Sequence, residues 1–154
     1  MIQPITIAES PAQTAAVIHI VTARDRIEEV LGPAIAEVIG AVTAQGIGPV
    51  GPVFTYHREI RPDVFDLDVG VPVSAPVQPV GRVTAGELPA ATVARTVYTG
   101  PYVGLGAAWG EFTAAVGAAG HEPAKNCWER YLAGPESNPD PATWQTELNR
   151  PVAG

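Results

Sequence analysis

The chain has little of several residue types on which whole classes of protein depend. It contains one cysteine, Cys127, and one lysine, Lys125, among 154 residues. A single cysteine excludes an intrachain disulfide, and it argues against a zinc site because such sites need several thiolate or imidazole ligands. The three histidines, His19, His57 and His121, are far apart in the sequence and lack metal-binding spacing. We therefore expect neither a metal nor a cofactor.

Basic residues and long apolar runs are also scarce. Nine Lys and Arg against 16 Asp and Glu give a formal charge of −7, and the basic residues do not cluster. Direct binding to nucleic acid, which depends on neutralising phosphates, is not expected. No apolar run reaches the roughly 18 residues of a membrane-spanning helix. Residues 1–20 lack the basic start of a signal peptide. We expect a cytoplasmic protein without a membrane partner, as a monomer or weak homodimer.

What the chain does contain is an internal repeat. Residues 31–46 align without a gap with residues 105–120, and eight of the sixteen positions are identical. A period of about 75 residues is too long for a solenoid repeat and too short for two independent domains. We therefore predict a single domain, 1–154, made of two half-repeats, about 1–76 and 77–154. Such a domain is expected to carry a cleft between its halves.

Hydrophobic patterning predicts the same order of elements in each half. Alternating or β-branched stretches predict strands near 2–7, 14–21, 53–58 and 64–73, and then near 81–85, 92–98, 126–132 and 143–152. Apolar residues at helical spacing predict one helix between Thr22 and Gly46, with Thr22 and Asp25 resembling a capping box, and another over 101–119. The predicted fold is α+β: two tandem β-α-β-β repeats with pseudo-twofold symmetry, an antiparallel sheet and two helices on one face.

Two acidic residues hold matching places in the halves. Glu147 lies in the last predicted strand, and Asp68 lies at the equivalent point of the first half. A partly buried carboxylate there could recognise a cation or handle a proton. The alternative is a solvated outward face of an edge strand. Glu129 and Tyr131 share a strand face and form a further carboxylate–phenol pair.

Aromatic residues are few, but most fall at predicted strands and helix starts. Tyr56 and Tyr131 occupy equivalent strands, and Trp109 lies on the apolar stripe of the second helix. Tyrosine faces around a carboxylate suit flat apolar or cationic organic molecules. Aromatic packing across a sheet accounts for the same pattern, so both interpretations stay open.

Five segments give the chain a resemblance to a known family. They are residues 51–57, 65–73, 100–105, 128–132 and 144–152, in this order along almost the whole chain. They resemble the GyrI-like small-molecule-binding domain, also called the bacterial effector-binding domain of the SOUL-like superfamily. The resemblance implies two β-α-β-β units with a ligand groove between them. It also implies an acid of the last strand, here Glu147, at the floor of the groove.

The same resemblance implies wall residues and a class of ligand. Tyr131, with Tyr56, Phe65, Tyr102, Trp109 and Glu129, would line the groove. The ligand would be hydrophobic, planar or cationic. Family members include effector domains of transcription regulators and drug-sequestering proteins. Because residues 1–20 are predicted to be strands of the domain itself, no DNA-binding helix-turn-helix is expected in this chain.

Three functions follow as hypotheses. The first is a stand-alone protein that binds such compounds for drug or toxin sequestration or effector sensing, with Glu147 offsetting the ligand's charge. The second is a hydrolase that adds water to strained, cyclopropane-containing DNA-alkylating natural products. In it Glu147 would be the general base, and Tyr131 or Tyr102 would donate a proton. The third is a protein-interaction module of the gyrase-inhibitor type.

Overall fold

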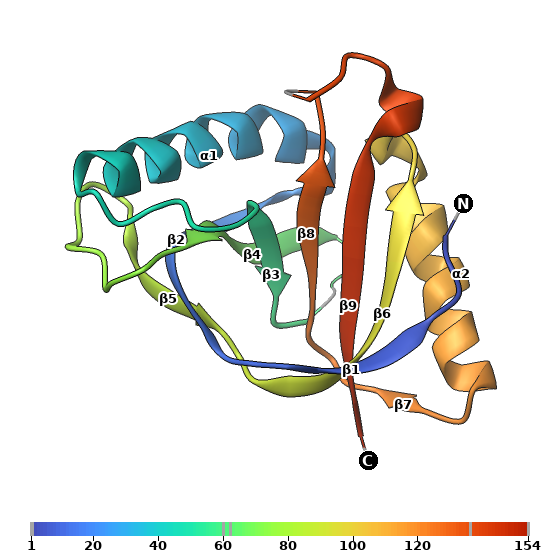
Figure 1. Ribbon diagram of the computed structural model, residues 1–154. Helices are drawn as coiled ribbons and strands as arrows, with labels where there is room; N and C mark the ends of the chain where they lie inside the picture. Colours follow the sequence, from blue (N-terminus) through green and yellow to red (C-terminus); the bar gives the residue numbers. More distant parts are fainter. Residues whose placement is uncertain (1, 60, 62, 136, 154) are drawn as a thin grey trace. The chain divides into compact units, whose positions relative to one another are not determined.

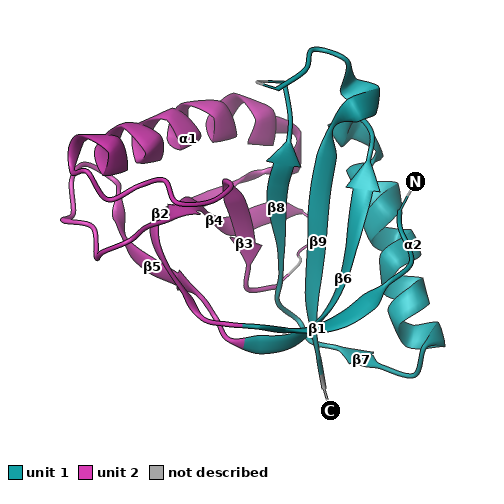
Figure 2. Ribbon diagram, in the orientation of Figure 1, with its two compact units in different colours: residues 1–10, 91–154 teal, residues 11–90 magenta. Residues whose placement is uncertain are grey.

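The computed structural model describes residues 2–59, 61, 63–135 and 137–153, which divide into two compact units. Unit 1 comprises residues 1–10 and 91–154, and unit 2 comprises residues 11–90 (Figure 2). Each unit is an antiparallel sheet with one long helix (Figure 1). The predicted α+β class is therefore confirmed. No helix among the described residues is both long enough and apolar enough to cross a membrane.

The strands described in unit 2 lie in the order β3-β4-β2-β5. They are β2 (Gln13–Ala23), β3 (Phe54–His57), β4 (Val64–Pro72) and β5 (Thr84–Leu88), and helix α1 (Ile27–Ala44) follows β2. Residues on alternate positions point to opposite faces, so Ile18 and Ile20 of β2 and Val69 of β4 form one apolar face. Val38 of α1 packs on that face and completes the core. The other face carries Asp66 and Asp68, the polar positions of the alternating β4 sequence.

Glycine is required at one point of this sheet. Gly70 of β4 pairs with Val17 of β2. A Cβ at Gly70 would collide with the carbonyl oxygen of Ala16. The close approach of these two strands therefore depends on the absence of a side chain.

The predicted capping box at the start of α1 is wrong. Thr22 still belongs to β2, where it pairs with Phe65 of β4, and a 3₁₀ turn, η1 (Arg24–Arg26), separates the strand from α1. Among the described residues, no side chain caps either the turn or the helix. Pairing along the full length of β2 outweighs the local capping signal, because each further residue gains ladder hydrogen bonds with β4.

Unit 1 contains strands in the order β1-β6-β9-β8, with the short β7 pairing with β9. Their bounds are β1 (Thr6–Ser10), β6 (Ala91–Thr99), β7 (Glu122–Pro123), β8 (Cys127–Ala133) and β9 (Gln145–Ala153). Helix α2 (Leu105–Ala118) follows the 3₁₀ turn η2 (Tyr102–Gly104), and η3 (Pro141–Thr143) precedes β9. Phe112 and Val116 of α2 pack on Leu148 and Val152 of β9. These contacts fix which face of the sheet the helix covers.

The two long helices end in the same way. Gly46, with φ of 71°, follows α1, and Gly120, with φ of 86°, follows α2. In each case the next amide donates to the carbonyl five residues before it: Ile47 to Val42 at 3.1 Å, and His121 to Val116 at 3.2 Å. Both ends are Schellman motifs, which favour glycine because an L side chain is strained at positive φ. Gly46 and Gly120, which hold equivalent positions in the sequence repeat, therefore have the same structural role.

The edge strands do not follow the predicted halves of the sequence. β1, from the first half, pairs with β6 of unit 1, and β5 pairs with β2 of unit 2. Both strands also lie three to four residues later than predicted, at Thr6–Ser10 and Thr84–Leu88. Periodicity in short exposed strands is weak, so their bounds depend on the partner strand rather than on local sequence.

Candidate functional site

Glu147, the acid predicted to hold the ligand, lies in β9 on the face opposite α2. Its side chain is 11% exposed. One of its carboxylate oxygens, Oε1, is 3.5 Å from Arg95 Nε and 3.3 Å from Arg130 Nη1. Asn149 Nδ2 donates to the same oxygen at 2.9 Å. Two guanidinium groups therefore surround one carboxylate.

Asn149 completes this cluster. It is fully buried, and its Oδ1 accepts a hydrogen bond from Arg95 Nε at 2.6 Å. The charge of Glu147 is thus compensated within the protein, as buried carboxylates require. This arrangement favours a structural role, because an incoming cation would have to compete with two arginines already in place.

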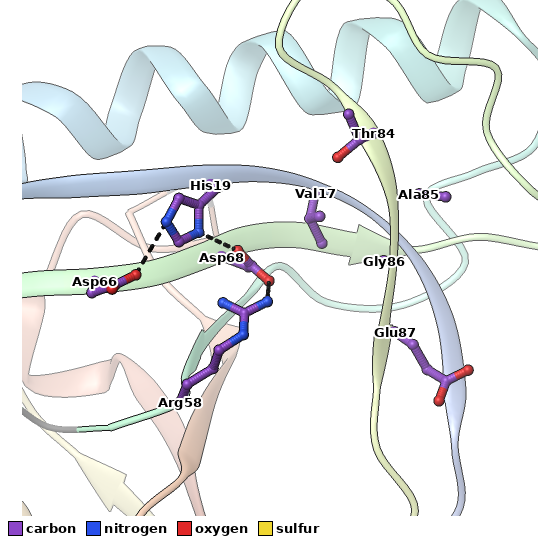
Figure 3. Close-up of a pocket in the computed structure, with 9 residues that line it drawn as sticks. All are labelled: Val17, His19, Arg58, Asp66, Asp68, Thr84, Ala85, Gly86 and Glu87. Atoms are coloured by element: carbon purple, nitrogen blue, oxygen red, sulfur yellow. Dashed lines mark hydrogen bonds and ion pairs between the residues drawn. The ribbon is translucent and has the colours of Figure 1, made fainter.

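Asp68, the matching acid of unit 2, is also held by an arginine. Arg58 Nη2 donates to Asp68 Oδ2 at 2.7 Å, and this hydrogen bond raises the pKa of Arg58. His19 Nδ1 is 2.9 Å from Asp68 Oδ1 (Figure 3). His19 Nε2 is 3.2 Å from Asp66 Oδ1, without the alignment of a hydrogen bond. These groups line an open pocket of about 410 Å³ beside β5. Its charged groups are engaged mainly with one another.

The predicted wall residues of unit 2 do not share one face. Tyr56 pairs with Asp68 across the strands, and the Arg58 guanidinium carbon lies 5.7 Å from the centre of its ring. Phe65 has the opposite parity along β4 and packs against the core that α1 covers. His57 meets the Phe65 ring edge-on at 5.8 Å. Tyr56 and Phe65 therefore cannot line one surface of this sheet.

The predicted residues that do come together are in unit 1, around Glu129. Trp109 of α2 donates its indole N–H to Glu129 Oε2 at 2.6 Å. Tyr131, two residues along β8, donates its hydroxyl to Glu129 Oε1 at 2.7 Å. The Tyr102 ring of η2 meets the Tyr131 ring edge-on at 6.0 Å and lies 4.8 Å from the Trp144 ring. One carboxylate thus stands among four aromatic side chains, all half-buried. We call these five residues the Glu129 cluster.

Glu129 differs from Glu147 in its electrostatic surroundings. No lysine, arginine or histidine forms an ion pair with Glu129 among the described residues. Its partners are neutral N–H and O–H donors, so its negative charge is hydrogen-bonded but not neutralised. Each carboxylate oxygen can accept a second hydrogen bond. The cluster can therefore still receive a cation or a donor.

Glu147 and Tyr131, the predicted acid–phenol pair of a hydrolase, lie on opposite faces of the sheet. Glu147 pairs with Arg130 in the β8–β9 register, and Tyr131 pairs with Thr146. Successive residues of a strand point to opposite faces, so the two side chains diverge. Glu129 takes the place beside Tyr131 instead. The Glu-x-Tyr spacing of β8 indicated in the sequence that Glu129 and Tyr131 lie side by side. Trp144 is the one aromatic residue of the cluster that the predicted site did not include.

The structure also describes the surroundings of the single cysteine and the possible metal ligands. Cys127 is fully buried, and burial raises the pKa of its thiol to about 12, so it stays protonated at neutral pH. Within the part of the chain that the structure describes, no group of three His, Cys, Asp or Glu side chains is placed to hold a metal ion.

A comparison with models of protein families identifies the family of this chain. The model of the GyrI-like small-molecule-binding domain matches residues 3–153. The chain belongs to this family. The resemblance carried by the five sequence segments is thereby confirmed, and so is binding of small molecules as the family's general property. No curated protein matches the sequence.

Solved structures similar to this GyrI-like chain show the same fold at low sequence identity. EcmrR in a complex with DNA is 22% identical with a TM-score of 0.84, and the match covers 98% of this chain and 57% of EcmrR. SAV2435 bound to tetraphenylphosphonium is 10% identical with a TM-score of 0.65, covering 99% and 95% of the two chains. A hydrolase from Listeria innocua is 14% identical with a TM-score of 0.61, covering 97% and 91%.

Proposed function

We propose that this GyrI-like protein binds hydrophobic organic cations that carry flat aromatic rings through the Glu129 cluster of unit 1. The observation that carries the proposal is the state of Glu129: its carboxylate is hydrogen-bonded to Trp109 and Tyr131 and has no ion pair among the described residues. In this role Glu129 replaces Glu147, whose charge Arg95 and Arg130 already compensate. The groove predicted between the halves of the sequence stays a prediction.

The physical basis is a combination of charge and flat apolar surface. A cation about 4 Å from a carboxylate gains roughly 4 kcal/mol at the effective dielectric of a protein surface. The faces of Tyr102, Tyr131 and Trp144 add cation–π attraction and apolar contact. The formal charge of −7 favours the approach of cations over anions. Sequestration of drugs or toxins, or sensing of an effector, would use such a site.

Tetraphenylphosphonium, the compound bound to SAV2435, is a suitable probe because it combines charge with four aromatic rings. Binding is measured by titration calorimetry with the wild-type protein, Glu129→Gln and Glu147→Gln. Glu129→Gln keeps the hydrogen-bonding shape but removes the charge, so its affinity should fall about tenfold or more. Glu147→Gln serves as the matched control and should bind as the wild type does.

Triphenylphosphine oxide provides a neutral counterpart of the probe. Its affinity should be similar in the wild type and Glu129→Gln, because an uncharged ligand gains no ion–ion attraction from the Glu129 carboxylate. Equal affinity of the wild type and Glu129→Gln for tetraphenylphosphonium would contradict the proposal. A loss confined to Glu147→Gln would return the role to Glu147.

A second candidate function rests on the 2.7 Å hydrogen bond between Tyr131 and Glu129. This carboxylate–phenol pair could add water to a strained electrophilic ring. Glu129 would take a proton from the attacking water, and Tyr131 would give its own proton to the carbon that the broken ring bond leaves with an electron pair. Incubation with a cyclopropane-containing alkylating compound and mass spectrometry test it. The product should be heavier by one water, and Glu129→Gln should reduce the rate about 10²–10⁴-fold.

A further inference from the structure

One buried hydroxyl in unit 1 has no hydrogen-bond partner among the residues that the structure describes. Thr146 in β9 is fully buried, and its Oγ1 is paired with no group among the described residues. Most buried side-chain polar atoms in proteins are hydrogen-bonded, because burial without a partner leaves the loss of water uncompensated. The Thr146 hydroxyl therefore needs an explanation that packing alone does not give.

Thr146 lies next to the Glu129 cluster. It is opposite Tyr98 of β6 on one side and opposite Tyr131 of β8 on the other. It has the parity of Leu148, which packs beneath α2, so it faces the same side as Glu129 and Tyr131. Directly opposite residues have Cβ atoms about 4.5–5.5 Å apart. The hydroxyl is thus within one side-chain length of the proposed ligand site.

The two neighbouring phenols do not donate to it. Tyr98 donates its hydroxyl proton to the Pro101 carbonyl oxygen at 2.8 Å, and Tyr131 donates its proton to Glu129 at 2.7 Å. A phenol has one proton to give. Both hydroxyl groups beside Thr146 therefore donate their protons to acceptors other than Thr146.

We propose that Thr146 determines ligand specificity by forming a hydrogen bond with a polar group of the bound molecule. This inference rests on the proposed function of the Glu129 cluster. Thr146 and Glu129 are diagonal neighbours across β9 and β8, which places them roughly 7–8 Å apart. The preferred ligand is then an aromatic cation with a hydroxyl, carbonyl or ether oxygen at that distance from its charge. The half-buried ring of Tyr131, which lies opposite Thr146, must turn aside to admit it, a common rearrangement on binding.

The test compares two probes that differ by one hydroxyl group. Tetraphenylphosphonium and (4-hydroxyphenyl)triphenylphosphonium are titrated into the wild type, Thr146→Val and Thr146→Ser. The wild type should bind the hydroxylated probe roughly tenfold more tightly, as a buried hydrogen bond allows. Thr146→Val keeps the shape but lacks the hydroxyl, so it should lose the preference while binding the parent compound as before. Thr146→Ser should retain the preference.

Thermal unfolding separates this role from a structural one. Because the hydroxyl has no partner in the free protein, Thr146→Val should unfold at the same or a higher temperature than the wild type. A lower unfolding temperature, or a preference that survives in Thr146→Val or is absent in the wild type, overturns the inference. When one of these results occurs but tetraphenylphosphonium still binds and Glu129→Gln still weakens its binding, the inference about Thr146 fails and the proposed function stands. If neither probe binds the wild type, the proposed function fails with it.

Discussion

Glu129 and Glu147 have the same side chain and opposite surroundings. Glu147 contacts two guanidiniums and an amide, whereas Glu129 contacts an indole and a phenol. A carboxylate paired with arginines has its charge compensated in the free protein, while one held by neutral donors keeps its attraction for a cation. The neighbours, rather than the residue type, decide which acid can bind a ligand.

The pairing around Glu147 leads to a stability prediction. Arg95→Met should lower the free energy of unfolding by about 1–3 kcal/mol, because it leaves the buried Asn149 Oδ1 without its donor and Glu147 with one arginine. The measurement is urea unfolding followed by circular dichroism. Arg26→Met is the matched control: its ion pair with Glu29 is exposed, so the change should stay within about 0.5 kcal/mol. Equal effects of the two substitutions would show that the buried cluster contributes nothing particular.

At the scale of elements, the helices are defined most sharply at their C-terminal ends. Both lack a side-chain cap at the start, and both end in a glycine with positive φ. Both halves of the sequence repeat have glycine at this position, and other residues cannot adopt the Schellman geometry without strain. The polypeptide leaves each helix in the same way and enters the next strand from there.

Substitution of these glycines tests that account. Gly46→Ala and Gly120→Ala should each lower the free energy of unfolding by about 1–2 kcal/mol, the cost of a left-handed conformation with a Cβ. Gly40→Ala, within α1 and with open space around its position, should raise it by up to about 1 kcal/mol. Chemical denaturation of the three variants supplies the comparison. Stabilisation by Gly46→Ala would be inconsistent with the observed φ.

At the scale of the whole molecule, the compact units exchange their edge strands relative to the halves of the sequence. The N-terminal strand β1 belongs with residues 91–154, and β5, which lies past the midpoint of the chain, belongs with residues 11–90. Unit 1 consequently includes a strand from the first half of the sequence, and unit 2 includes a strand from the second half. The N-terminus is therefore part of the unit that carries the Glu129 cluster.

Removal of residues 1–10 should act on unit 1 in particular. The amides of β6 that face β1 should exchange their hydrogens faster, because their ladder partners are lost, and Ile2 and Ile5 no longer cover the core below α2. Amides of β2 in unit 2 serve as the internal control and should keep their protection. Hydrogen exchange followed by mass spectrometry resolves the two segments. Uniform loss of protection in both would contradict the assignment of β1 to unit 1 alone.

The family, the α+β class, the repeat and the positions of most elements can be predicted from the sequence alone. These follow from local signals: apolar periodicity in β4, β6 and β9, helical spacing in α1 and α2, and the stop at Gly46 and Gly120. The acid of the Glu129 cluster and three of its four aromatic residues were also predicted from the sequence.

The contacts that these residues make depend on the tertiary structure. The pairing of Arg95 and Arg130 with Glu147, the approach of Trp109 to Glu129, and the unpartnered hydroxyl of Thr146 all join residues on different elements. Strand register sets these neighbours, and a shift by one residue would reverse every face. Because register depends on pairing across long sequence separations, no local pattern in the chain could reveal which carboxylate keeps its charge available.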